Sequence, residues 1–396
     1  MRGVVRPLAA TMLVQAMVAM AVSAVPVLSP LLAESYGLKA SLVGLYASLV
    51  FAGAIAFTLL GGVLVRRLGA VRCSQAALAI AAAALAATAL GPLAGVVAFA
   101  VVTGMGYGLA TPAASHILAR VTPADRRGVV FSLKQSAVPA GGLLAGLAAP
   151  PVAAAFGWQA ALVAVALVVG AAAAVIAPLR AGLDADRNPR APVSLGAPFA
   201  AVARVLGDRS LRALALATLA FACMQSSLFA IFPAFLVERG GLALIAAGQA
   251  FATLQCAGVV ARIAMGWASD KLFPARTLLA GLGFAMAAAG ALAAQLDAAW
   301  PVAAVFAMAG LIGFVATGWP GIYLAEIVRL VPADEVGVAT GGTVAFSFLG
   351  IVAGPALFSA IVAATGSYAP AFYAFGALAA AAGALLWLAA RRARQL

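Results

Sequence analysis

The sequence predicts an all-α membrane protein whose twelve transmembrane helices form two pseudo-symmetric six-helix bundles. Three observations predict this class: an apolar composition, basic residues gathered between apolar runs, and an internal repeat. Of the 396 residues, 65% are hydrophobic and 9% are charged, which leaves too little polar surface to cover a water-soluble domain. Since one helical crossing takes about 20 apolar residues, this content supplies about twelve crossings.

Apolar runs between charged residues or Pro and Gly breaks place the expected spans. The first set covers 8–33, 41–65, 74–91, 94–118, 129–153 and 158–178. The second set covers 213–237, 244–268, 276–295, 300–326, 338–363 and 369–390. We therefore expect an N-terminal bundle over 1–179, a cytoplasmic linker over 180–212 and a C-terminal bundle over 213–396.

The second part of the linker has an amphipathic pattern of apolar and basic residues. Phe199, Val202 and Val205 fall on one side of a helix, and Arg204 and Arg209 fall on another. The pattern is typical of a short helix lying on a membrane surface, and a solvated linker is the alternative.

The formal net charge of +13 comes from basic residues whose positions indicate the orientation of the chain in the membrane. With both termini in the cytoplasm, every basic residue except Lys39, Lys134, Arg239 and Arg262 falls on the cytoplasmic side or in the linker. The positive-inside rule therefore indicates that both termini are cytoplasmic. We expect an integral protein of a bacterial-type cytoplasmic (inner) membrane. It also removes the reason to expect a nucleic-acid partner.

Two shifts of the sequence reveal the internal repeat. A shift of 204 places Glu34 on Glu238, Gly44 on Gly248 and Gly62 on Gly266, and a shift of 209 places Arg120–Gly128 on Arg329–Gly337. Parallel repeats of this kind recur in secondary transporters, whose substrate site lies near mid-membrane between the halves.

The loop Gly62-Val-Leu64-Val-Arg66-Arg67-Leu-Gly69 and its copy Gly266-Trp-Ala-Ser-Asp270-Lys271 resemble a signature of the major facilitator superfamily, Gly-x-Leu-Ala-Asp-Arg-x-Gly-Arg-Arg. The resemblance covers nearly the whole chain and implies the major facilitator fold. The first copy has Arg66 where the family has Asp, whereas the second copy keeps Asp270.

In the family this acid helps to close the cytoplasmic side by meeting the positive start of a helix in the other half. The gating residues that the resemblance implies are Asp270, Arg66, Arg126 and Arg127. A simple topological role as a loop charge is the alternative for Asp270.

Two cations, Lys134 and Arg262, fall inside the expected fifth and eighth spans. Charges within spans are costly and functional by default. The family fold implies that these two helices face each other, and two cations ~7 Å apart repel by about 2 kcal/mol at an effective dielectric of about 20. With no acid at that depth, we expect an anionic substrate as the partner. Snorkelling to the cytoplasmic face and packing against backbone carbonyls are the alternatives.

The position of Arg262, four residues before Gly266, resembles the substrate arginine of oxalate/formate antiporters, monocarboxylate transporters and nitrate porters. The planar guanidinium can donate two parallel hydrogen bonds to a carboxylate. The chain departs from these groups at Thr58, where nitrate porters carry an arginine, and at Gly258, where monocarboxylate transporters carry a coupling acid. Two coupling schemes stay open. Transport could be coupled to titration of Lys134, or one anion could be exchanged for another.

Further polar and aromatic residues lie in spans that line the cavity in this family. They are Gln15, Gln225, Tyr107, Trp319 and Tyr323. Each is a candidate to orient substrate, and the alternative is that the glutamines link helices and the aromatic rings fill the core. His116, near the end of the fourth span, is expected to be a structural or rim residue, with proton handling as the alternative.

The sequence predicts a secondary active transporter that moves a small organic anion, a carboxylate, by alternating access. Because no nucleotide loop, metal-ligand cluster or nucleophile-base arrangement occurs in the sequence, we expect neither an enzyme nor any cofactor or metal. The expected partners are the anion, a co-transported or exchanged ion and membrane lipid, with the protein as a monomer. Two alternatives are proton-coupled multidrug efflux, which predicts a mid-membrane acid, and a non-transporting receptor or scaffold, which predicts appended domains.

Overall fold

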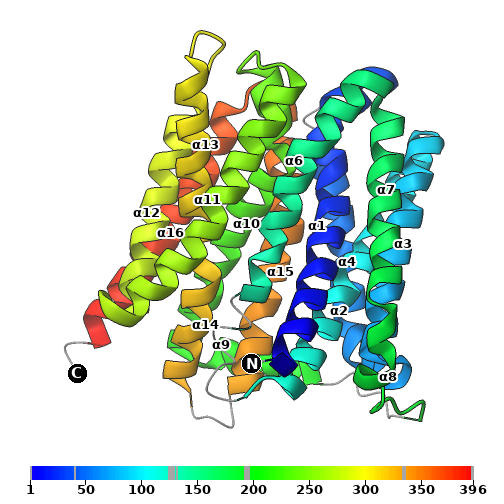
Figure 1. The fold of residues 1–396 in the computed structure, drawn as a ribbon. Helices are drawn as coiled ribbons and strands as arrows, with labels where there is room; N and C mark the ends of the chain where they lie inside the picture. Colours follow the sequence, from blue (N-terminus) through cyan, green and yellow to red (C-terminus); the bar gives the residue numbers. More distant parts are fainter. Residues whose placement is uncertain are drawn as a thin grey trace. The chain divides into compact units, whose positions relative to one another are not determined.

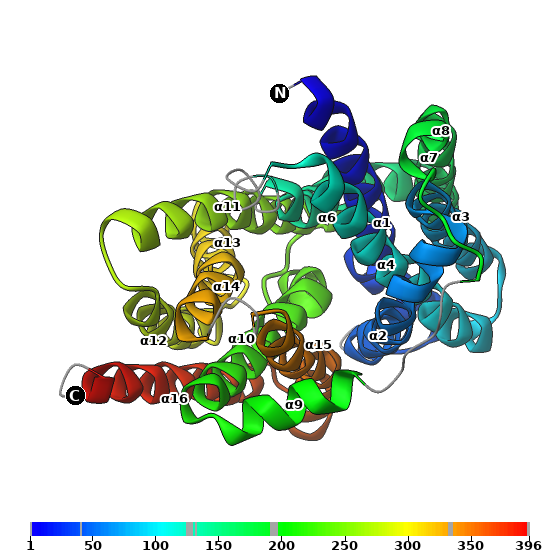
Figure 2. The same cartoon turned by 90° about the horizontal axis from the view of Figure 1, so that it is seen from below.

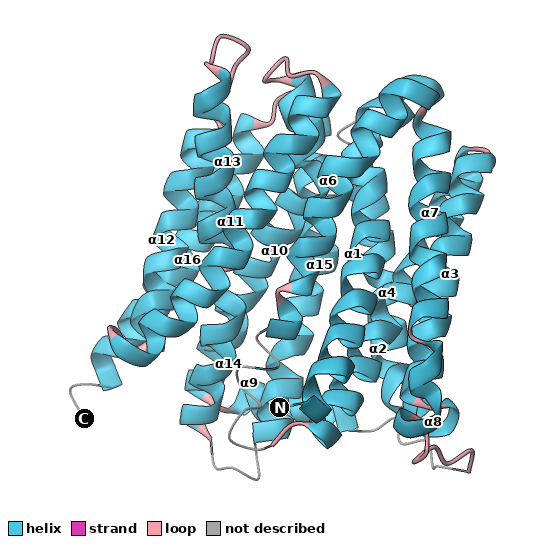
Figure 3. Ribbon diagram, in the orientation of Figure 1, coloured by secondary structure: helices cyan, strands magenta, loops and turns pink. Residues whose placement is uncertain are grey.

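The computed structural model describes residues 2–39, 42–123, 130, 133–190, 197–331 and 336–393. All regular secondary structure in these residues is helical (Figure 3). Eleven of the described helices are long and apolar enough to cross a membrane, and Val43–Thr58 is a shorter apolar helical stretch. The predicted all-helical membrane fold is therefore confirmed.

The chain divides into two compact units, which are described separately. The first comprises Met1–Val193 and Leu242–Ala252. Its helices are α1 (Arg2–Tyr36), α2 (Val43–Leu68), α3 (Ala70–Leu90), α4 (Leu93–Val121), α6 (Ala137–Phe156), α7 (Trp158–Val175), the 3₁₀ helix η3 (Ala177–Leu179) and α8 (Arg180–Leu183). Within this unit the beginning of α1 lies at the same end as α8 (Figure 1).

The second unit comprises Ser194–Gly241 and Thr253–Leu396. Its helices are α9 (Ala197–Gly207), α10 (Arg209–Glu238), the larger part of α11 (Leu244–Lys271), α12 (Ala275–Ala293), α13 (Val302–Thr317), α14 (Trp319–Leu330), α15 (Val336–Thr365) and α16 (Ala369–Ala393). Figure 2 shows α10 beside α15 in this unit, and α1 beside α6 in the first.

The internal repeat is visible as the same helix contact inside each unit. A Cβ atom at Gly104 of α4 would lie 1.7 Å from the carbonyl oxygen of Val50 of α2. In the second unit, a Cβ atom at Gly313 of α13 would lie 2.0 Å from the carbonyl oxygen of Leu254 of α11. The residues in these pairs are related by the shifts of 204 and 209 read from the sequence. Only glycine allows backbones to approach this closely.

A second pair of glycine contacts is related by a shift of 209 for the glycines and of 203 for the carbonyl residues that they approach. A Cβ atom at Gly141 of α6 would lie 2.2 Å from the carbonyl oxygen of Ala16 of α1. A Cβ atom at Gly350 of α15 would lie 2.3 Å from the carbonyl oxygen of Leu219 of α10. Each unit therefore contains close helix contacts at two glycines, and a shift of 209 relates the glycines of the two units.

Two predicted spans differ in detail from the structure. The tenth, predicted as 300–326, is interrupted at Gly318, where α13 ends and α14 begins with Trp319 and Pro320. Proline suits the first turn of a helix because its missing N–H would have no intrahelical partner there. The fifth, predicted from 129, has its long helix only from Ala137, after a turn at Ser136 that follows helical residues 133–135.

The second part of the linker forms a short helix, and its predicted place on a membrane surface stays a prediction. This helix, α9, packs against α10 and α15 of its own unit, and Val205 is fully buried. The next helix, α10, begins after Asp208, whose carboxylate accepts hydrogen bonds from the backbone amides of Ser210 at 2.8 Å and Leu211 at 2.9 Å. These bonds satisfy first-turn donors that lack intrahelical acceptors.

Candidate functional site

Lys134 is the central residue of a polar cluster in the first unit. Its side chain is 2% exposed, and Nζ donates to Gln15 Oε1 at 2.9 Å and to Gln135 Oε1 at 3.2 Å. Gln15 belongs to α1, so the fold brings together two of the residues predicted to bind substrate. Buried ammonium groups require such hydrogen bonds because transfer out of water is costly.

Thr111 of α4 joins this cluster and was not predicted. Its hydroxyl donates to Gln15 Oε1 at 3.3 Å, so two donors converge on one amide oxygen. Because an ammonium group can only donate, the amide of Gln15 must turn its oxygen toward Lys134. Gln15 is 1% exposed, and its Nε2 atom has no hydrogen-bond partner among the residues that the structure describes.

Tyr107 lies one helical turn before Thr111 on α4. Its ring packs edge-on against Phe51 of α2, with ring centroids 6.3 Å apart and an interplanar angle of 84°. Since residues four apart share a helix face, the position of Tyr107 was the sequence signal that could have pointed to Thr111.

A second cluster, in the second unit, contains three of the predicted residues. Gln225 Oε1 of α10 accepts a hydrogen bond of 3.0 Å from Trp319 Nε1 of α14. The rings of Trp319 and Tyr323 are 5.8 Å apart in an edge-to-face arrangement. The hydroxyl of Tyr323 donates to Thr343 Oγ1 of α15 at 2.6 Å. The fold thus joins Gln225, Trp319 and Tyr323 through direct contacts.

Arg262 lies in the part of α11 that belongs to the second unit. The side chain is partly exposed, while its Nε atom is buried. One turn earlier, a Cβ atom at Gly258 would lie 2.5 Å from Thr317 Oγ1 of α13. Lys134 and Arg262 therefore belong to different units, and their proximity stays a prediction from the family resemblance.

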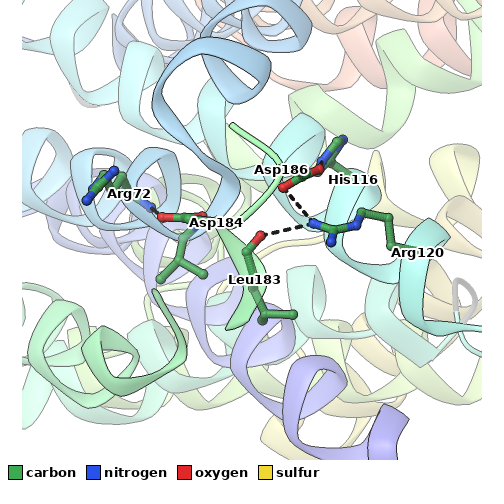
Figure 4. Close-up of polar contacts among 7 residues, drawn as sticks. Arg72, His116, Arg120, Leu183, Asp184 and Asp186 are labelled. Carbon is green, nitrogen blue, oxygen red and sulfur yellow. Dashed lines mark hydrogen bonds and ion pairs between the residues drawn. The ribbon is translucent and has the colours of Figure 1, made fainter. Parts of the chain in front are cut away.

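A third polar cluster lies where α3 and α4 meet the segment after α8 (Figure 4). Asp184, which is 6% exposed, accepts hydrogen bonds from the backbone amides of Val71 at 2.7 Å and Arg72 at 3.2 Å. These amides are in the first turn of α3, where a carboxylate satisfies orphan donors and the partial positive charge. An acid from the beginning of the linker therefore caps the helix that follows the Arg66 loop.

Asp186 extends this cluster to α4. Its carboxylate lies 2.6 Å from Arg120 Nη1 and 2.6 Å from His116 Nε2, and Arg120 also donates to the carbonyl of Leu183 at 3.2 Å (Figure 4). Partial burial acts to raise the pKa of the Asp186 carboxyl, but the hydrogen bond and charge of His116, with the charge of Arg120, hold this pKa below its usual value. His116 is therefore part of a contact that holds the linker.

The predicted gating residues are only partly described. Arg66 is exposed in the last turn of α2, and its carbonyl accepts a hydrogen bond of 2.6 Å from the Asn188 amide. Asp270 belongs to α11, with its side chain outside the described part of the structure. Arg126 and Arg127 also lie outside the described residues.

The long apolar helices in both units define a polytopic membrane protein. The sequence profile of the Major Facilitator Superfamily matches residues 11–341, and the chain belongs to this family. It is thus an integral membrane protein of a transporter family.

Solved structures of similar fold include a bacterial homolog of the human lysosomal transporter Spinster. Its inward-facing, unoccupied conformation has a TM-score of 0.77 and 17% identity, covering 98% of this chain and 96% of that chain. The inward-facing, occupied conformation has a TM-score of 0.73 and 16% identity, covering 97% and 96%. A POT family transporter in complex with 5-aminolevulinic acid has a TM-score of 0.76 and 13% identity, also covering 97% and 96%. No curated protein sequence matches the chain.

Proposed function

We propose that this protein is a secondary active transporter that moves a small organic anion, a carboxylate, across the cytoplasmic membrane by alternating access. The observation that carries the proposal is the burial of Lys134, whose Nζ contacts with Gln15 and Gln135 are to neutral amide oxygens. These hydrogen bonds hold the buried ammonium group in a fixed position within the first unit. An anionic ligand adds charge-assisted hydrogen bonds, which are stronger than neutral ones.

Arg262 is the proposed second cation of the site. A guanidinium offers a planar pair of donors that matches the two oxygens of a carboxylate. Gln225 and the Trp319–Tyr323 pair supply an amide and two aromatic faces in the same unit. Tyr107 and Gln15 contribute the corresponding groups in the first unit. An amphipathic lining of this kind suits a small organic acid.

The POT family transporter of similar fold was solved with 5-aminolevulinic acid. That compound carries a carboxylate, so the fold of the POT family transporter accommodates a carboxylate ligand. Because the identity is 13%, the comparison supports only the compatibility of ligand class and fold. The choice of a carboxylate here depends on Lys134 and Arg262.

We further propose that both termini lie in the cytoplasm of a bacterial-type cell, that the protein is a monomer, and that a co-transported or exchanged ion completes the cycle. Asp270 is the proposed cytoplasmic gate, with Arg66, Arg126 and Arg127. Asp270→Asn should change transport rates and the balance of inward-open and outward-open states, measured by accessibility of introduced cysteines. Unchanged rates and accessibility would leave Asp270 as a topological charge.

A thermal-shift screen of the purified protein tests the ligand class. The panel contains mono- and dicarboxylates, inorganic anions and lipophilic cations, at matched ionic strength. We expect carboxylates to raise Tm, because a ligand that binds the folded state stabilises it. Stabilisation by the cations alone would favour multidrug efflux, and stabilisation by no compound would favour a receptor or scaffold.

A further inference from the structure

The contact between Gln15 and Lys134 leads to an inference that rests on the proposed function and gives it a mechanism. We propose that Gln15 Oε1 occupies the position at Lys134 Nζ that a substrate carboxylate oxygen takes, and that the Gln15 amide turns to donate from Nε2 to the bound carboxylate. Gln15 is then a switchable ligand of the ammonium group. Thr111 is the positioning residue that holds the amide in its first orientation.

The hydrogen bonds around Gln15 are unequal at the two ends of its amide. Oε1 receives donors from Lys134 Nζ at 2.9 Å and from Thr111 Oγ1 at 3.3 Å, which uses both lone pairs of the oxygen. Nε2 is buried and has no partner in the described part of the chain. A glutamine that only links two helices in a membrane gains most when both ends are paired.

When a carboxylate enters, Lys134, Thr111 and Gln15 can all donate hydrogen bonds to it. A carboxylate has two oxygens that accept hydrogen bonds and none that donates. Lys134 donates to one oxygen, and the Thr111 hydroxyl is released to donate to the same group. Rotation of the terminal amide torsion of Gln15 turns Nε2 toward the other oxygen, which satisfies the buried donor. No covalent bond changes and no proton moves.

The same arrangement disfavours other ligand classes. A cation at this position would meet the ammonium group of Lys134 directly, and a ligand that only donates would leave Nε2 unsatisfied. The cluster therefore selects acceptor groups that carry negative charge. This goes beyond the presence of two cations, because it assigns discrimination to a neutral side chain.

The first test is Gln15→Glu, which places a carboxylate permanently beside Lys134. We expect at least a hundredfold loss of affinity for the carboxylate that most stabilises the wild-type protein, measured by titration of the Tm shift. Gln75→Glu is the matched control, because Gln75 lies in the same unit but contacts Ala173 and Arg180. The control should bind within about threefold of wild type. Wild-type affinity in Gln15→Glu would overturn the inference.

The second test exchanges the two side chains, Gln15→Lys together with Lys134→Gln. The exchange keeps one ammonium and one amide in contact, so we expect binding within about tenfold of wild type, whereas Lys134→Gln alone should lose binding. A purely structural glutamine predicts no such rescue. If Gln15→Glu does not fold, the comparison of the double variant with Lys134→Gln tests the inference alone. A double variant that binds carboxylate no better than Lys134→Gln overturns the inference.

The two proposals fail in different ways. If no carboxylate stabilises the wild-type protein, the proposed function is wrong and the role of Gln15 falls with it. If carboxylates stabilise the wild type and also Gln15→Glu with equal affinity, the proposed function stands and only the switch is wrong.

Discussion

The carboxylate of Asp184 accepts a hydrogen bond of 2.7 Å from the backbone amide of Val71, so a residue that follows α8 caps the beginning of α3. A second bond comes from the Arg72 amide at 3.2 Å. Asp184 and Val71 are far apart in sequence, so this cap fixes the path of the chain between them. It ties the start of the linker to the unit that precedes it.

Asp184→Ala should lower the free energy of unfolding by about 1 kcal/mol, the usual effect of removing a helix N-cap. It should also speed tryptic cleavage at Arg187 and Arg190, which are exposed in the segment that the cap holds. Asp208→Ala is the control, because Asp208 caps the helix that directly follows it. The control should lose similar stability without faster cleavage at Arg187. Unchanged cleavage in Asp184→Ala would contradict the tether.

Gly69→Ala should be more destabilising than Gly37→Ala. Both glycines have positive φ, 102° at Gly69 and 63° at Gly37, so both substitutions strain the backbone. At Gly69 the new Cβ would also lie 2.4 Å from Asp184 Cγ, whereas nothing lies within 4 Å at Gly37. Thermal unfolding in detergent measures the difference, and equal losses would mean that Asp184 does not pack on this turn.

The contact of Asp186 with His116 and Arg120 should be lost when the Asp186 carboxylate is protonated at low pH. Because the folded-state pKa of Asp186 is lowered, its stabilising contribution is fully present above the unfolded carboxyl pKa of about 3.9 and is lost as pH falls through the folded value. Hydrogen exchange of residues 184–190, corrected for intrinsic rates, should show constant protection from about pH 7 to pH 5 and a loss only below about pH 4.

Asp186→Asn is the comparison for this pH profile. The variant should show weaker protection at neutral pH and no further loss in the acid range, since the titrating group is gone. A wild-type profile that loses protection between about pH 7 and pH 5 would assign the contact to a group other than Asp186.

Gly104→Ala and Gly313→Ala should both lower Tm substantially. The new methyl groups would lie 1.7 Å and 2.0 Å from carbonyl oxygens of the neighbouring helix, so the helices must separate. Gly281→Ala in α12 has nothing within 4 Å of its Cβ position and should be neutral or slightly stabilising. If only one of Gly104→Ala and Gly313→Ala lowers Tm, the repeated contact does not contribute equally to the stability of the two units.

The spans and the repeat were predictable because both are linear features. Hydropathy locates an apolar run wherever it occurs, and the pairs Glu34 with Glu238 and Gly62 with Gly266 are visible by shifting the sequence. The break at Gly318 was missed although Gly-Trp-Pro is a helix-start pattern, because the apolar run continues across it. Hydropathy measures composition and does not detect a local change in backbone geometry.

The polar clusters were predictable only as separate residues. Gln15 and Lys134 stood out because polar groups are rare in spans, but their contact joins α1 to the segment before α6 and has no sequence signal. Thr111 was missed because a threonine in an apolar helix usually bonds its own backbone. Asp184 lies within the predicted linker, and no sequence pattern indicates that it caps α3, since capping a distant helix requires the chain to fold back.

The most direct test is uptake of the stabilising carboxylate into proteoliposomes containing wild-type protein, Lys134→Gln or Arg262→Ala. The proposed site predicts saturable uptake by the wild type and loss of uptake in both variants, with each variant correctly folded by size-exclusion chromatography. Undiminished carboxylate uptake by Arg262→Ala, or transport of lipophilic cations with no carboxylate uptake by the wild type, would contradict an anion site built on Lys134 and Arg262.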